Sequence, residues 1–117
     1  MKSFTLETRQ APSNTSVTVI DMQGELDTNN AADFEKTLDN IFSEGKYKIV
    51  LNMEKLIYIS SAGFGILMSN IKDVRKHRGD IKITNVRPDV YSIFELLELP
   101  GLFHILKTER EAIQEFA

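Results

Sequence analysis

The sequence contains no cysteine and only two histidines among its 117 residues. The absence of cysteine excludes disulfides, thiolate catalysis and cysteine-based zinc sites. Long apolar runs are also lacking: the longest, residues 62–68, is far shorter than the roughly 20 residues of a membrane-spanning helix. An excess of positive charge is missing as well, because the net charge is −3. We therefore expect no direct nucleic-acid partner and no membrane partner.

Several catalytic motifs are absent too. The chain has no HExxH, GxGxxG, Walker or GxSxG motif. His77 lies among basic residues and His104 lies in a short predicted strand without an evident acidic neighbour, so we expect surface or packing roles for both. The segment 63–65 follows a strand and opens a helix, as a phosphate-binding turn does, but it lacks the third glycine and the lysine. We expect a non-enzymatic protein with no metal and no cofactor.

What the sequence does contain is typical of one globular domain. Hydrophobic residues make up 42% of the chain and charged residues 26%. At 117 residues the chain is long enough for one core, and we predict a single domain over residues 1–117. The first five residues have no apolar signal core, which predicts a cytoplasmic protein. No apolar stripe is left over once the core is assigned, which predicts a monomer.

Hydrophobic periodicity predicts alternating strands and helices. Period-two or compact apolar runs predict strands near residues 4–7, 17–23, 48–53, 80–85 and 103–106. Helical stripes predict four helices, starting near residues 30, 62, 88 and 109. In the second helix the stripe consists of Phe64, Leu67, Met68, Ile71 and Val74, and in the third it consists of Val90, Ile93, Phe94 and Leu97.

Helix ends and loops are indicated by particular residues. Asn30 is the predicted N-cap of the first helix, Gly79 ends the second, and Pro88 fits the first turn of the third. Thr108 and Glu111 form a capping box for the last helix. The remaining predictions are a turn-rich loop over residues 11–16 and a turn at residues 24–27 that closes the second strand.

The resulting order, β-β-α-β-α-β-α-β-α, predicts an α/β fold. We expect a mostly parallel mixed sheet of four to five strands with about four helices. Functional sites in such sheets gather beyond the carboxyl ends of the parallel strands. Asp27 and Ser61 each follow a strand, so they could share one surface patch. One of the two serines, Ser60 or Ser61, could equally be a plain helix N-cap.

Several segments, spread over nearly the whole chain, form one recognisable pattern: residues 24–27, Phe34 with Leu38, residues 49–53, residues 58–65, residues 85–86 before Pro88, residues 93–97, and Leu102 with Phe103. Together they resemble STAS domains of the anti-sigma factor antagonist type. The resemblance implies a protein that binds an anti-sigma factor, itself a serine kinase, and so frees a sigma factor. It also implies that phosphorylation of a serine blocks this capture and that a serine phosphatase reverses it.

The resemblance places the phosphorylated serine at Ser61. The usual Asp-Ser-[Ser/Thr]-Gly pattern reads Ser60-Ser61-Ala62-Gly63 here, which leaves Ser60 as the alternative acceptor. The implied partner-binding surface consists of Asp27, Thr28, Asn29, Ser60, Ser61, Ala62, Gly63 and Phe64. Two other functions stay open: a STAS scaffold without phosphorylation in another signalling assembly, and a hydrolase with Ser61 as nucleophile.

Overall fold

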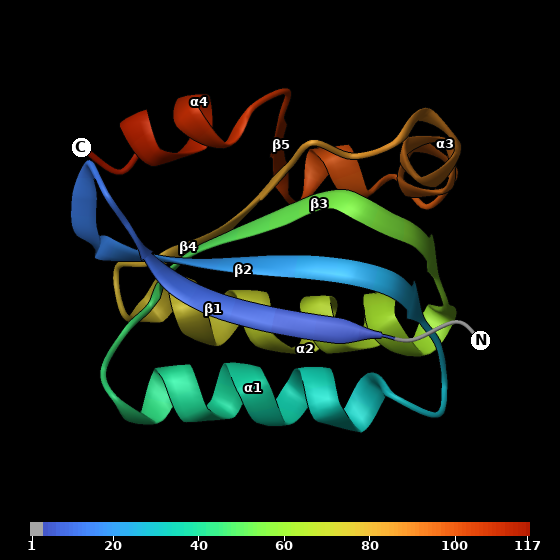
Figure 1. Ribbon diagram of the computed structural model, residues 1–117, viewed down its shortest axis with the longest axis horizontal. Helices are drawn as coiled ribbons and strands as arrows, with labels where there is room; N and C mark the ends of the chain where they lie inside the picture. The colour runs from blue at the N-terminus through green and yellow to red at the C-terminus, as the bar shows by residue number, and fades with distance from the viewer. Residues whose placement is uncertain (1–3) are drawn as a thin grey trace.

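Strands and helices alternate along the chain in a computed structural model that describes residues 4–117 (Figure 1). The predicted order is confirmed, with one short 3-10 helix in addition. The elements are β1 (Thr5–Ala11), β2 (Asn14–Leu26), α1 (Ala31–Ser43), β3 (Lys48–Ile59), α2 (Ser61–Lys76), β4 (Asp80–Thr84), α3 (Pro88–Leu96), η1 (Leu99–Gly101), β5 (His104–Leu106) and α4 (Glu109–Gln114). The expectations for residues 1–3 lie outside the described residues.

The five strands form one mixed sheet in the order β1-β2-β3-β4-β5. β1 pairs with β2 antiparallel, and every later neighbour is parallel. Helices α1 and α2 lie on one face of the sheet, while α3 and α4 lie on the other (Figure 1). The predicted α/β class with a mostly parallel mixed sheet is therefore confirmed.

Two hydrophobic clusters hold these layers together. The larger joins α1 and α2 to the sheet through buried side chains such as Phe34, Leu38 and Leu67. The smaller packs Ala112 and Ile113 of α4 against the other face of the sheet. Along β2, Val17 and Val19 belong to the smaller cluster, while Ile20 and Met22 belong to the larger. This alternation buries β2 on both faces, as expected for an inner strand.

Two strands are longer than predicted. The predicted loop over residues 11–16 is only a two-residue turn between β1 and β2, and β2 continues through Gly24 to Leu26. β3 runs on to Ile59 instead of ending at residue 53. The register between β2 and β3 shifts twice, and Gly24 has a φ of 98° beside the second shift. The glycine thus marks a bulge, where left-handed backbone is needed, and not the end of the strand.

Two residues of the predicted helical stripes lie outside the core. Met68 is 51% exposed and Leu97 is 50% exposed, so both predictions were wrong. Adjacent helical residues point about 100° apart, and Leu67 takes the inward position that Met68 would need. Leu97 is the C-cap of α3, where the helical stripe ends.

Capping at the later helices agrees with the sequence. Pro88 is the first residue of α3, and the Thr108 Oγ1 accepts a hydrogen bond from the Glu111 N–H at 3.2 Å. Within residues 4–117 no helix is long and apolar enough to cross a membrane.

Candidate functional site

The candidate site lies where β2 and β3 end. The last residues of these strands, Leu26 and Ile59, are parallel partners. The Ser60 N–H donates a hydrogen bond to the Leu26 carbonyl at 2.8 Å. The prediction that the turns after these two strands share one edge of the sheet is therefore confirmed.

Ser60 is the N-cap of α2. Its backbone is extended, with φ −85° and ψ 169°, and its Oγ accepts from the Gly63 N–H at 3.4 Å. Its carbonyl accepts the Phe64 N–H at 3.1 Å. The residue is only 9% exposed. The Ser60 hydroxyl is thus held inside the turn, where it satisfies one of the free N–H groups of the helix start.

Ser61 differs from its neighbour in position, exposure and side-chain hydrogen bonding. It is the first residue of α2, and it is exposed. Within residues 4–117 its hydroxyl has no hydrogen-bond partner. The first turn of α2 contains no acidic residue, so the partial positive charge of the helix start is not neutralised locally. Ser61 is therefore a reachable hydroxyl at a position that favours an added negative charge.

The residues after Ser61 anchor the turn. A Cβ on Gly63 would lie 2.8 Å from a Leu26 side-chain carbon, so the close approach of α2 to β2 requires glycine here. Phe64 is 4% exposed, and its ring meets Phe94 edge-to-face at 5.1 Å. Because Gly63 and Phe64 are buried, they support the surface from below, and the expectation that they face a partner needs correction.

The loop from Asp27 to Asn30 is tied by its own side chains. The Asp27 Oδ1 accepts the N–H groups of Asn29 at 2.9 Å and Asn30 at 3.1 Å. The Asn30 Oδ1 accepts the Asp27 N–H, and its Nδ2 donates to the Glu25 carbonyl. Asn30 therefore holds the loop and does not cap α1 through its side chain, in contrast to the prediction. Thr28 and Asn29 are left exposed beside the serine turn.

Neither histidine is placed to act on Ser61 as a base. His77 is the C-cap of α2, at the opposite end of a 16-residue helix, about 24 Å from Ser61. The His104 Nδ1 lies 2.6 Å from the Glu115 Oε1, so the expectation of no acidic neighbour was wrong. Within residues 4–117 no three His, Cys, Asp or Glu side chains are grouped to hold a metal ion.

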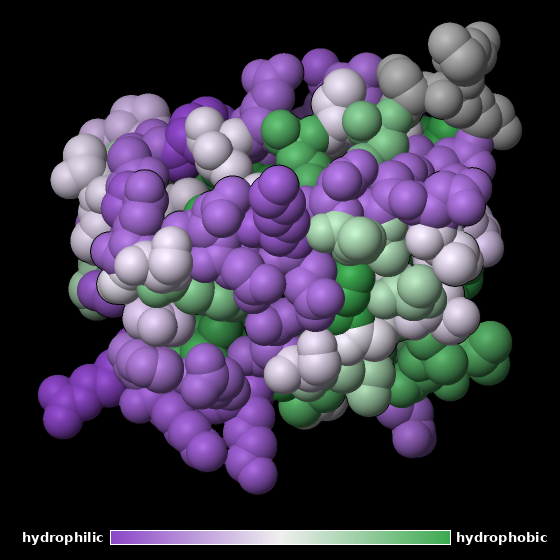
Figure 2. Space-filling view, turned by 90° about the horizontal axis from the view of Figure 1, so that it is seen from below, coloured by the Kyte–Doolittle hydropathy of each residue, from purple (hydrophilic) through white to green (hydrophobic). Residues whose placement is uncertain are grey.

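The exposed face of α2 contributes two residues that the sequence reasoning missed. Gly65 and Met68 are exposed and follow Ser61 by four and seven residues, so the three lie along one side of the helix. On the face formed by α1 and α2, hydrophobic surface is more extensive toward the right of Figure 2, the end at which β2 and β3 terminate. The spacing 61, 65, 68 could have identified this side.

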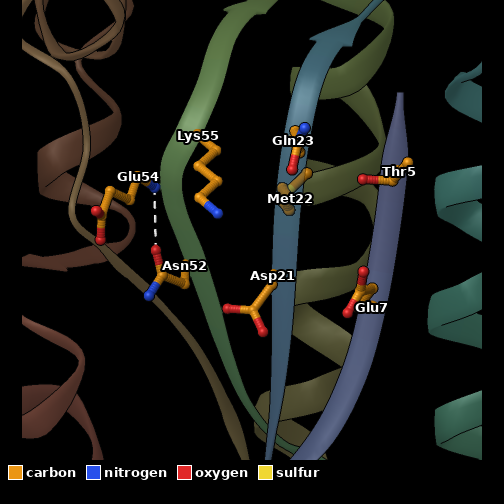
Figure 3. A pocket seen from close by; sticks show the side chains of 8 residues that line it. All are labelled: Thr5, Glu7, Asp21, Met22, Gln23, Asn52, Glu54 and Lys55. Atoms are coloured by element: carbon orange, nitrogen blue, oxygen red, sulfur yellow. Dashed lines mark hydrogen bonds between the residues drawn. The ribbon is translucent and has the colours of Figure 1, made fainter. Parts of the chain in front are cut away.

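A separate hollow lies over the middle of the sheet (Figure 3). It has a volume of about 390 Å³ and is lined by Thr5, Glu7, Asp21, Met22, Gln23, Asn52, Glu54 and Lys55. The Asp21 carboxylate is taken by Arg9, whose Nε and Nη2 donate to it at 2.8 and 3.2 Å. The hydrogen bonds that Arg9 donates to Asp21 and, with a smaller effect, to Glu109 raise the pKa of Arg9 above its usual value. These bonds fasten β1 and β2 to α4 and occupy the Asp21 carboxylate at the edge of the hollow.

Fold and site together define a class: an α/β domain with an exposed serine on a helix start at the carboxyl edge of its sheet. The STAS domain model matches residues 8–112, and the chain belongs to the STAS domain family. Over 95 residues it is 27% identical to BtrV, a candidate anti-sigma factor antagonist of Bordetella bronchiseptica, covering 81% of this chain and 82% of BtrV.

Two further likenesses agree with this membership. The anti-sigma-B factor antagonist of Staphylococcus aureus is 27% identical over 82 residues, which are 70% of this chain and 76% of that protein. The structure of the anti-sigma factor antagonist SpoIIAA in its unphosphorylated form superposes with a TM-score of 0.76 at 26% identity, covering 97% of this chain and 96% of SpoIIAA.

Proposed function

We propose that this protein is an anti-sigma factor antagonist that captures an anti-sigma factor with serine kinase activity and is switched by phosphorylation at Ser61. The names of the relatives support the first part of this proposal. The observation that carries the second part is the exposed, unbonded hydroxyl of Ser61 at the start of α2. Release of the sigma factor follows from capture, and a serine phosphatase returns the protein to its binding form.

The contrast between the two serines supports Ser61 as the acceptor. A kinase must bring the hydroxyl to the γ-phosphate of ATP, which a buried N-cap hydroxyl cannot reach without opening the helix start. Ser60 is in that position, and Ser61 is not. Serine is as good an N-cap as aspartate, so Ser60 keeps the capping role where the family pattern has Asp.

Phosphate at Ser61 changes the surface without demanding a new fold. The N–H groups and dipole of a helix start stabilise a phosphate, so α2 tolerates it. The modification adds about −1.5 to −2 charge units beside the Asp27 loop. A partner that docks against Asp27, Thr28, Asn29 and Ala62 and is shaped for a neutral Ser61 hydroxyl then meets repulsion and desolvation. A loss of about 1.4 kcal/mol of binding free energy already raises the Kd tenfold.

The test uses the full chain, a candidate anti-sigma kinase and ATP. Mass spectrometry is expected to find phosphate on Ser61 in the wild type and in Ser60→Ala, and none in Ser61→Ala. Ser61→Asp is expected to stay folded and to bind the kinase at least tenfold more weakly than Ser61→Ala. Phosphate on Ser60, or loss of the fold in Ser61→Asp, would contradict the proposal.

A second function is favoured by one departure from the family pattern. Ser60 replaces the usual aspartate, so this turn carries less negative charge than the turn that the kinase meets in other members of the family. The protein would then be a STAS scaffold that binds its partner irrespective of phosphate. Equal binding by the Ser61→Ala and Ser61→Asp variants would select this function. A hydrolase is disfavoured, because no histidine lies beside Ser61 to act as a base.

A further inference from the structure

The carboxyl end of α2, opposite Ser61, has an unusual residue in a common turn. The Gly79 N–H donates to the Val74 carbonyl and the Arg78 N–H to the Arg75 carbonyl, both at 3.0 Å. These two bonds define a Schellman motif with Arg78 at its left-handed position, where φ is 63°. Glycine is the residue that such positions favour, because a Cβ strains the backbone there.

The glycine beside Arg78 cannot take over this position. A Cβ on Gly79 would lie 1.9 Å from the Tyr47 carbonyl oxygen, so residue 79 must stay glycine where the two loops touch. Nothing comparable holds residue 78 as arginine, since its side chain has no ion pair within residues 4–117. Arg78 is one of three residues other than glycine with a positive φ within residues 4–117, with Asn85 and Glu98, and it is the cationic one. Strain that packing does not explain is a reason to look for a function.

Arg78 lines a hollow together with three other groups that are or can be positively charged. The hollow has a volume of about 290 Å³, and Lys46, Lys48 and His77 line it too. The Lys46 Nζ lies 3.2 Å from a Glu44 oxygen, and His77 lies 4.0 Å from Asp73. Like Arg78, Lys48 has no ion-pair partner within the described part of the chain. We call these four residues the basic pole.

An aromatic stack forms one wall of the basic pole. The Tyr47 and His77 rings are parallel within 5° with centroids 4.0 Å apart, and Phe42 stacks on Tyr47 at 5.3 Å. One face of the His77 ring is therefore covered by Tyr47. The His77 side chain is nonetheless 46% exposed, so a planar ligand could reach it. The exposed hydroxyl-bearing residues Thr15 and Ser16 complete the rim.

We propose that the basic pole binds a small phosphate-bearing molecule. Two unpaired cations beside a hollow match the charge of a phosphate, and they stand out in a chain whose net charge is −3. The volume is close to the lower limit of about 300 Å³ for small-molecule pockets, whereas a protein partner would need a much larger contact area. The site lies at the other end of α2 from Ser61 and does not depend on the function proposed there.

The first test is a titration of the ¹⁵N-labelled full chain with inorganic pyrophosphate, followed by amide shifts in NMR spectra. Saturable shifts are expected at residues 46–48 and 77–79. Arg78→Gly is expected to weaken binding at least tenfold and to raise the melting temperature by a few degrees, because glycine relieves the strain. The matched control is Lys72→Ala, which removes an exposed lysine of α2 outside the hollow. It is expected to bind like the wild type.

A higher melting temperature together with weaker pyrophosphate binding in Arg78→Gly cannot come from a damaged fold. Equal binding by wild type and Arg78→Gly, or an equal loss in Lys72→Ala, would overturn the proposal, because attraction to general positive charge would then suffice. Titration with ADP distinguishes the source of the phosphate. If ADP binds more tightly than pyrophosphate, and His77→Ala removes this difference, the site also holds a ring stacked on His77. If ADP and pyrophosphate bind equally, the site recognises the phosphate groups alone. Shifts centred on the Ser61 turn would place the site elsewhere and overturn it as well.

Discussion

Replacing each serine of the turn by alanine should separate a structural hydroxyl from a free one. Ser60→Ala removes the acceptor of the Gly63 N–H, and loss of a serine N-cap costs about 1 kcal/mol of unfolding free energy. The hydrogen bond from the Gly63 N–H is long at 3.4 Å, so we expect a loss of unfolding free energy below the upper end of the range for N-cap removal. For 117 residues, about 1 kcal/mol corresponds to a fall of about 4 °C in melting temperature. Urea denaturation with an unchanged m-value is the assay.

Ser61→Ala is the matched control, one residue away. Ser61 is exposed and unbonded, so its replacement should change stability by less than about 0.5 kcal/mol. Ser60→Asp should restore or exceed wild-type stability, because aspartate also caps and its charge suits the helix dipole. If Ser61→Ala lost as much stability as Ser60→Ala, the assignment of cap and free hydroxyl would be refuted, and the choice of Ser61 as acceptor with it.

Substitutions at four further residues, two in α2 and two in the sheet, test the packing of the fold, each by urea denaturation. Gly63→Ala should cost about 1–3 kcal/mol by overpacking against β2 and β3, whereas Gly65→Ala should gain about 0.5–1 kcal/mol because its Cβ enters open space in a helix. Arg9→Ala should cost about 1 kcal/mol, since a two-bond pair to one carboxylate is lost at a partly exposed position. Lys82 is buried, and its Nζ lies 3.2 Å from the Asp80 Oδ2 and 3.3 Å from the Glu115 Oε1. Lys82→Ala should therefore cost about 2 kcal/mol by leaving these two carboxylates without their buried partner, and Lys82→Met should cost less. A gain in Gly63→Ala, no loss in Arg9→Ala, or a larger loss in Lys82→Met than in Lys82→Ala would each contradict the packing described above.

The sequence predicted the order of elements well because each element has its own hydrophobic period. It predicted strand ends poorly, since these depend on pairing partners. β3 continues to Ile59 because β2 lies beside it as far as Leu26, and no local pattern contains that information. Gly24 was interpreted as the end of a strand, although the same left-handed freedom serves a bulge within one.

The sequence was enough to locate the candidate site, but not to decide which role each of its residues has. Chain order was enough to bring the turns after β2 and β3 to one edge of the sheet. It could not decide which of Ser60 and Ser61 caps α2, because both residues precede the same apolar stripe. It also assigned Phe64 to the partner surface and Met68 to the core. In the structure Phe64 is buried against Phe94, and Met68 is exposed, so α2 is rotated about its axis relative to the predicted stripe.

This rotation explains how the proposed switch at Ser61 can share one turn with residues that stabilise the fold. Ser60, Gly63 and Phe64 point into the structure and carry the capping and packing, while Ser61 and Gly65 point outward and carry neither. A charge added at Ser61 therefore acts on whatever docks there, with little effect on the core beneath. Gly65 also serves no purpose in the fold. A Cβ there would enter open space, and a glycine inside a helix lowers stability. Its small surface suits a partner that approaches α2 closely, so Gly65→Ala should stabilise the free protein and weaken capture of the kinase in the binding assay. Capture unaffected by the added methyl group would place the docking surface on the Asp27 loop alone.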